Sequence, residues 1–286
     1  MTNKIILSLV LLFSLGFVLR AEEHGVSSPD GKLEVKLRID GRTMFEVWYD
    51  KEKMVDFSTI GMHLSDGRTV GADAVTSVKK NRVNGKIDVV IGKNRTLKEC
   101  YNEIILSYGK EYDLVVRTYN EGWAYRFVTH FDKDIVIDKE DAEFNFAFTP
   151  IVYFPECDSY AAAEREQSGE VHQIHQGYRN FERLYKVYNA PGEIPEGHFS
   201  VSPVLFEYPE KPYKIVVTES DTYDYPGLYM EAVGQNSMRG KWAAYPKEVM
   251  DSDPANPNRW YSNHLVITRE AVSYTHLRAH ETGRNL

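Results

Sequence analysis

The chain has little cysteine, and beyond its first 21 residues it has no apolar run long enough to cross a membrane. The two cysteines, Cys100 and Cys157, lie far apart and fit no metal-binding spacing. In an oxidising compartment they would be able to form a disulfide, and otherwise they are two buried thiols; both readings stay open. A chain of 286 residues can bury one large core without such cross-links.

Positive charge is also scarce. The chain has 34 Lys and Arg residues against 42 Asp and Glu residues, which gives a net charge of −8. A nucleic-acid partner would require clustered Lys and Arg, so we expect none. The sequence also lacks a nucleophile elbow, a phosphate loop, a dinucleotide fingerprint and a Cys–His arrangement. Paired carboxylates that act as acid and base cannot be picked out by spacing, so no catalytic residue is assigned.

The first 21 residues predict a secretory signal peptide. Lys4 provides the positive start, residues 5–18 are apolar, and Ala21 stands before the expected cleavage point. The apolar part has about 14 residues, whereas a membrane-spanning helix needs about 20. We therefore expect a periplasmic or secreted protein that is not held in a membrane.

Strand signals dominate the rest of the chain. Leu33, Val35, Leu37 and Ile39 alternate with charged residues, which predicts a half-buried strand. Similar runs predict strands at 87–91, 101–108, 113–119, 123–129, 144–148, 213–218 and 265–270. Turn signals such as Ser65-Asp66-Gly67 and Asn84-Gly85 separate most of them. The pattern predicts an all-β fold, a large antiparallel two-sheet sandwich.

Residues 158–188 lose this alternation and predict an irregular excursion with one or two short helices. His172 and His175 lie here with several glutamates, and such a cluster is either a metal site or a solvated segment. The glutamates are Glu164, Glu166 and Glu170. Glu182 has aromatic neighbours that would hold its segment while the carboxylate points into a neighbouring cavity. From the residues alone, however, the simpler interpretation is a charged side chain exposed to solvent.

Three sequence stretches together resemble the N-terminal domain of glycoside hydrolase family 97. They read SPDGKLEVKL from residue 28, NEGWAYRF from residue 120 and TESDTYDYPGLYM from residue 218. The resemblance covers about residues 27–270. Members of that family are secreted bacterial exo-acting α-glycosidases. They hydrolyse α-linked oligosaccharides, with α-glucosidase and α-galactosidase types.

The resemblance implies a galactose-mutarotase-like supersandwich, incomplete at its C-terminal end. It also implies that the catalytic acids lie on a barrel that follows this domain and is absent from this chain. Residues 22–271 would be the non-catalytic domain that packs on the barrel. Residues 272–286 resemble translated read-through, so we leave them out of the expected domain. His276 and His280 in that tail have helical zinc spacing but no third ligand, and we read them as a coincidence.

The resemblance further implies a calcium ion at the active site, with one glutamate supplied by this domain. Glu182, followed by Tyr185, is the best match, and Glu219 at the end of a predicted strand is the fallback. Calcium takes about 6–8 oxygen ligands, so one carboxylate from this domain would be part of a larger shell. The residues after Glu219, from Asp221 to Gly227, are typical of a turn.

Two other functions stay open. A stand-alone carbohydrate-binding module would use surface tyrosines and tryptophans. A mutarotase-like epimerase would need a histidine and an acid together on a concave face. His63, His130 and His198 have no obvious acidic partner in the sequence.

Overall fold

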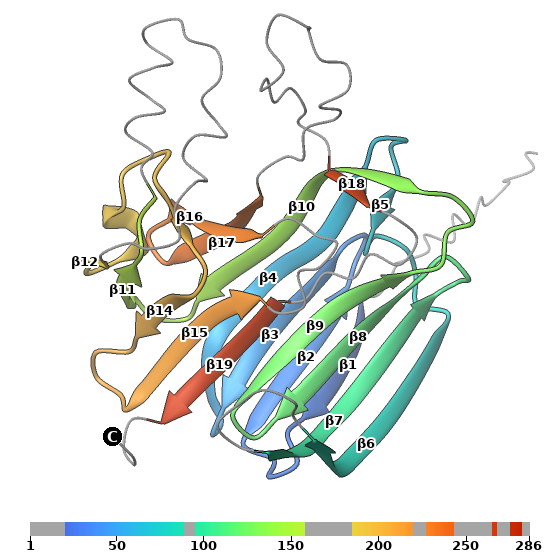
Figure 1. Ribbon diagram of the computed structural model, residues 1–286, viewed down its shortest axis with the longest axis horizontal. Helices are drawn as coiled ribbons and strands as arrows, with labels where there is room; N and C mark the ends of the chain where they lie inside the picture. The colour runs from blue at the N-terminus through green and yellow to red at the C-terminus, as the bar shows by residue number, and fades with distance from the viewer. Residues whose placement is uncertain are drawn as a thin grey trace, which may run out of the picture.

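The computed structural model describes residues 21–88, 95–157, 185–219 and 227–242, together with the backbone of two short strands at 265–267 and 275–281. Strands form two facing sheets in Figure 1. All the pairings are antiparallel, so the predicted all-β sandwich is confirmed. Within these residues, no helix is both long and apolar enough to span a bilayer.

The ten-stranded sheet is built mostly from the first part of the chain. In spatial order its main path is β1 (Glu22–Ser27), β2 (Leu33–Ile39), β3 (Thr43–Tyr49), β4 (Glu52–Leu64), β10 (Ile135–Phe146), β17 (Ser237–Trp242), β16 (Leu228–Gly234) and β13 (Phe199–Val201). Two short strands lie off this path, β5 (Thr69–Val70) on β4 and β18 (Leu265–Ile267) on β10.

The nine-stranded sheet faces it. Its order is β12 (Lys186–Tyr188), β11 (Ile151–Phe154), β14 (Val204–Glu207), β15 (Tyr213–Glu219), β19 (Thr275–Glu281), β9 (Gly122–Thr129), β8 (Tyr112–Tyr119), β7 (Thr96–Tyr108) and β6 (Ser77–Asp88). A single 3₁₀ turn, η1 (Pro191–Glu193), lies in the described connections.

The core lies between the two sheets. In β2 every second residue is buried, as the alternation predicts. Trp123, Tyr125 and Phe127 share one face of β9, and each is at most 2% exposed, so all three lie in the core. The Trp123 ring lies 4.6 Å from that of Phe45 on the opposite sheet, a distance at which aromatic pairs attract beyond simple burial.

One sequence expectation needs correction, and one open alternative can be decided. Asn84-Gly85 is not a turn, because both residues lie inside β6 and pair with Cys100 and Glu99 of β7. The long partner strand holds this dipeptide extended. No disulfide joins the two cysteines, which both lie in described ranges: Cys100 is partly exposed and Cys157 is buried.

Part of the tail that the sequence analysis left out of the domain, residues 272–286, also has a regular backbone. Residues 275–281 form β19 within the nine-stranded sheet. The expectation that 272–286 is read-through concerns the origin of the segment and stays an expectation. As a strand, this segment separates positions 276 and 280 by about 13 Å, since the rise is about 3.3 Å per residue. His276 and His280 therefore do not have the helical spacing of a zinc pair.

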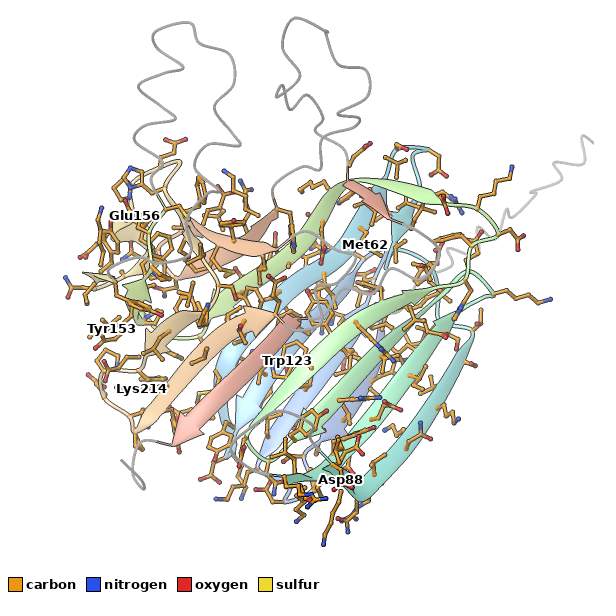
Figure 2. The ribbon with its side chains drawn as sticks, viewed as in Figure 1. Met62, Asp88, Trp123, Tyr153, Glu156 and Lys214 are labelled. Carbon is orange, nitrogen blue, oxygen red and sulfur yellow. The ribbon has the colours of Figure 1, made fainter. Side chains whose placement is uncertain are left out.

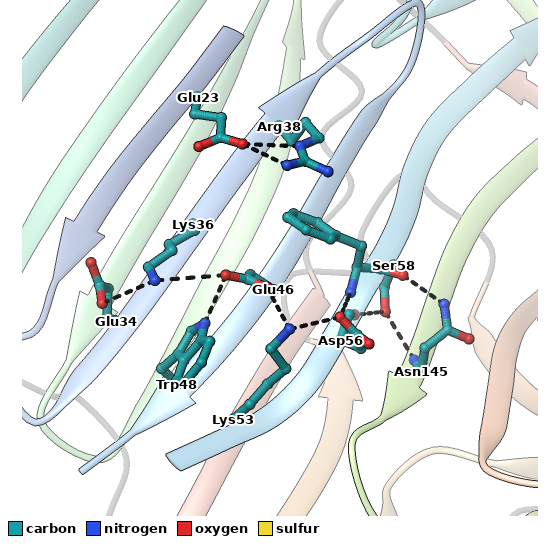
Figure 3. A network of polar contacts seen from close by, with 11 residues as sticks. Glu23, Glu34, Lys36, Arg38, Glu46, Trp48, Lys53, Asp56, Ser58 and Asn145 are labelled. Carbon is teal, nitrogen blue, oxygen red and sulfur yellow. Dashed lines mark hydrogen bonds and ion pairs between the residues drawn. The ribbon is translucent and has the colours of Figure 1, made fainter. Parts of the chain in front are cut away.

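Charged and aromatic side chains cover part of the outer face of the ten-stranded sheet (Figure 3). Glu46 is the centre of this group and is only 6% exposed. Trp48 Nε1 donates to Glu46 Oε1 over 2.7 Å, Lys53 Nζ lies 3.0 Å from Oε2, and Lys36 Nζ lies 3.7 Å from Oε1. Lys36 also stands over the Trp48 ring, 4.5 Å from its centroid. We call these four residues the Glu46 network.

Candidate functional site at the Glu156 end

One end of the sandwich carries a buried carboxylate, Glu156, which Figure 2 places far from Trp123 in the core and from Asp88 at the opposite end. Glu156 follows β11 and forms an isolated backbone bridge with Ser200 of β13. Next to it, the Cys157 amide donates to the Phe199 carbonyl over 2.8 Å, and the Val201 amide donates to the Pro155 carbonyl over 3.2 Å. These bonds link a strand of one sheet to a strand of the other, so the position of Glu156 is fixed by the backbone.

Three side chains converge on this carboxylate. Lys186 Nζ donates to Oε1 over 2.8 Å, and the Tyr188 hydroxyl donates to Oε2 over 2.6 Å. His198 Nδ1 lies 2.9 Å from Oε1. Glu156 and His198 are both buried, at 6% and 8% exposure. We call these four residues the Glu156 cluster.

The protonation of Glu156 reflects two opposing effects. Burial raises the pKa of its carboxyl, but hydrogen bonds from Lys186 and Tyr188 and the charges of His198 and Lys186 outweigh it. The net pKa lies below the usual value, so the carboxylate is ionised at neutral pH. Since Lys186 and Tyr188 form part of β12, the ionised carboxylate ties the end of β11 to β12 across the 158–184 segment.

A small apolar cluster lies beside Glu156. It consists of Cys157, Phe199, Val201 and Tyr229. The rings of Phe199 and Tyr229 meet edge to face with centroids 5.7 Å apart. Burial, together with the charges of Cys157 and Glu219, raises the pKa of Tyr229 to about 12, so the phenol stays protonated at neutral pH.

Glu219, the fallback acid, is described in full. It is the last residue of β15, and its Oε1 accepts a hydrogen bond of 2.6 Å from the amide of Leu228, at the start of β16. Burial raises its pKa to about 7, which the Leu228 hydrogen bond only partly opposes. Within the described residues no basic side chain forms an ion pair with it. Glu219 therefore joins the two ends of the predicted turn and is a partly buried carboxyl without a cation.

The preferred acid of the sequence analysis, Glu182, lies outside the described residues, as do Glu164, Glu166, Glu170, His172 and His175. Tyr185, expected to follow it in the site, is 53% exposed. Across the ranges that the structure describes, no three His, Cys, Asp or Glu residues come together as a metal site. These ranges thus supply at most part of a metal shell.

Sequence reasoning missed the acidic partners of three histidines. His63 Nε2 lies 2.5 Å from Asp141, His130 Nε2 lies 2.9 Å from Asp113, and His198 pairs with Glu156. The partners come from other strands, so no local pattern identifies them. In each pair the acid and the imidazole contact each other directly.

Comparison with known families identifies the family to which this sandwich belongs. The family model Glycosyl-hydrolase 97 N-terminal matches residues 26–260, most of the chain. The chain belongs to this family. The glycoside hydrolase 97 assignment confirms the resemblance seen in the sequence motifs.

A curated relative and two solved structures agree with the family. The chain is 26% identical over 232 residues to a retaining alpha-galactosidase of Bacteroides thetaiotaomicron. The aligned region covers 80% of this chain and 33% of the relative. A glycoside hydrolase family 97 enzyme from Pseudoalteromonas sp. strain K8, solved with acarbose, superposes with a TM-score of 0.67 at 13% identity, over 90% of this chain and 36% of that one. A beta-arabinopyranosidase also superposes with a TM-score of 0.67, at 16% identity, over 90% of this chain and 40% of that one. These two structures support the fold, and this chain spans about a third of the curated relative.

Proposed function

We propose that residues 22–271 are the non-catalytic N-terminal domain of a secreted α-glycoside hydrolase, of α-galactosidase or α-glucosidase type. The observation that carries this proposal is the family match together with its coverage, because the chain corresponds to only about a third of an α-galactosidase relative. The remaining two thirds would hold the catalytic acids and bind an α-linked oligosaccharide. This domain would pack against them and help to shape the sugar site. Residues 1–21 would direct export to the periplasm or beyond.

The proposal is tested by reading the natural gene past codon 270. A continuing frame with alternating strand and helix patterns supports a hydrolase with a barrel. A stop codon at this point favours the alternative, a stand-alone carbohydrate-binding module. An epimerase has less support, because the family model that matches the chain is that of a glycoside hydrolase domain.

We also propose that this domain lends one carboxylate to a calcium ion held mainly by the rest of the enzyme. Glu182 is the candidate from the sequence. Glu219 has support from the structure, since it is a partly buried carboxyl with no basic partner in the described ranges. A hard divalent cation would stabilise the ionised form of such a group. When bound, the ion would polarise oxygen atoms of the substrate.

Amide substitutions separate the two candidates in the full-length enzyme. Glu219→Gln keeps an oxygen that accepts from Leu228 but removes the charge, and Glu182→Gln is the matched change. The variant of the true ligand should need about tenfold more calcium for half-maximal activity, equivalent to about 1.4 kcal/mol, at an unchanged melting temperature. Calcium titration of activity and of intrinsic fluorescence measures this. If neither variant shifts the calcium midpoint, the domain supplies no carboxylate ligand.

A further inference from the structure

Strand β19 fills a gap in the middle of the nine-stranded sheet. It pairs with β15 along its whole length and with β9 from Thr275 to Arg278, antiparallel to both. Figure 1 shows it, in red, between orange β15 and green β9. In the part of the chain that the structure describes, no other strand joins β15 to β9. Without β19 the sheet would be two separate pieces.

The two edges that face this gap have no other strand partner in the described structure. The far edge of β15 is used by β14, and the far edge of β9 is used by β8. Neighbouring strands lie about 4.8 Å apart, so a gap bridged on both sides by one strand is about 10 Å wide. Backbone amides and carbonyls on both edges need hydrogen-bond partners, and a single extended segment provides them for both.

The gap also lies over the core. On β9, Trp123 and Tyr125 are 2% and 1% exposed, and on β15, Ile215 and Val217 are 1% and 0% exposed. Position 277 stands in register between Val217 and Trp123. Residues directly opposite in an antiparallel pair share a face of the sheet, so an empty gap would leave the edge of this apolar core open to water.

The sequence of the segment offers little specific packing. Residues 275–281 read THLRAHE, and of the positions in register with the core face only 277 is a large apolar residue. Binding in the gap therefore depends mainly on backbone hydrogen bonds. Such recognition tolerates many sequences but excludes proline, which lacks the amide donor.

We propose that the gap between β15 and β9 is a strand-acceptor site. It binds an extended, proline-free segment of about seven residues, antiparallel to both edges, by the strand addition known from peptide-recognition domains. In this chain the occupant is residues 275–281. Because the edges of β15 and β9 form the site, the proposal holds whatever the origin of the tail, and it is independent of the proposed hydrolase function.

A cleavable form of the full chain tests the proposal. A protease site is inserted between Ala271 and Val272, the folded protein is cut, and gel filtration follows the released 15-residue piece, residues 272–286. We expect the piece to co-elute with the body and to exchange with a fluorescent peptide of the same sequence. The amount of a Leu277→Pro peptide that replaces the bound piece should be at least tenfold lower. A peptide with Asn285→Pro, outside the strand, is the matched control and should exchange like the parent.

Hydrogen exchange on the uncut chain gives a second measurement. Leu277→Pro should speed amide exchange in β15 and in Gly122–Tyr125 of β9, or prevent folding, whereas Asn285→Pro should do neither. The proposal is overturned if the cut piece separates from the body. It is equally overturned if the two proline peptides exchange alike, or if the two proline chains show the same protection and folding.

Discussion

Glu156 is the single residue with the most unusual surroundings in the described structure, because a buried carboxylate there holds three partners from outside its own strand. Removing one partner of a buried ion pair costs about 3–5 kcal/mol, since the remaining charges lose their compensation. Its role is therefore to hold β11, β12 and β13 in one arrangement.

Acid should weaken this cluster. The folded-state pKa of Glu156 lies below its usual value of 4.5, so its stabilisation is present above pH 4.5 and is lost as pH falls through the lower folded pKa. Glu156→Gln should lower the melting temperature at pH 7 and flatten its dependence on pH below 4.5. Thermal melts from pH 3 to 7 measure both effects. Glu34→Gln, an exposed acid on β2, is the control, and equal pH profiles for the two variants would contradict the assignment.

Gly61 provides a second test at this scale. A Cβ atom there would lie 2.8 Å from the carbonyl oxygen of Val70, a backbone atom that β5 holds in place. Gly61→Ala should therefore destabilise the fold by about 1–3 kcal/mol. At Gly25 the nearest atom would be at an ordinary 3.7 Å, so Gly25→Ala should be close to neutral. Chemical denaturation compares the two, and similar midpoints would mean that β5 moves aside freely.

Among the elements, the strands of the ten-stranded sheet are joined on their outer face by the Glu46 network. Glu46 is buried under its own partners, whereas the Lys36 side chain is 41% exposed. Loss of Glu46 leaves the Trp48 indole N–H without its acceptor and takes one carboxylate partner from Lys53 and one from Lys36. Loss of Lys36 removes only an exposed charge, and exposed ion pairs contribute about 0–1 kcal/mol.

We therefore expect Glu46→Ala to destabilise the protein by about 1–3 kcal/mol, the usual cost of leaving partly buried polar groups unsatisfied. Lys36→Ala should cost about 0.5 kcal/mol or less, and this small cost should vanish in 1 M salt. Urea unfolding at low and high salt gives both numbers. If Lys36→Ala lowered the free energy of unfolding as much as Glu46→Ala does, Glu46 would not be the main stabilising residue of the network.

The elements differ in how far the sequence predicts them. The alternation in β2 and the strand predicted at 123–129 rest on local patterns, and both are confirmed. Asn84-Gly85 was predicted as a turn from local preference alone, but pairing with β7 overrides it. The partners of Glu156, which are Lys186, Tyr188 and His198, lie 30 or more residues away, beyond any spacing rule. The site was thus less predictable than the fold, because its contacts depend on how distant strands meet.

For the whole molecule, family membership and fold agree with the motifs read from the sequence. The central claim is that this domain does not carry out the chemistry. The chain corresponds to 33% of the length of its α-galactosidase relative.

Hydrolysis of aryl α-galactosides and aryl α-glucosides tests that claim most directly. Release of the aryl group is measured for this chain alone and for the same residues continued through the rest of the natural gene. The account predicts no turnover above blank by the chain alone and clear turnover of at least one of the two substrates by the longer protein. Turnover by the chain alone, abolished by a substitution within it, would contradict the account.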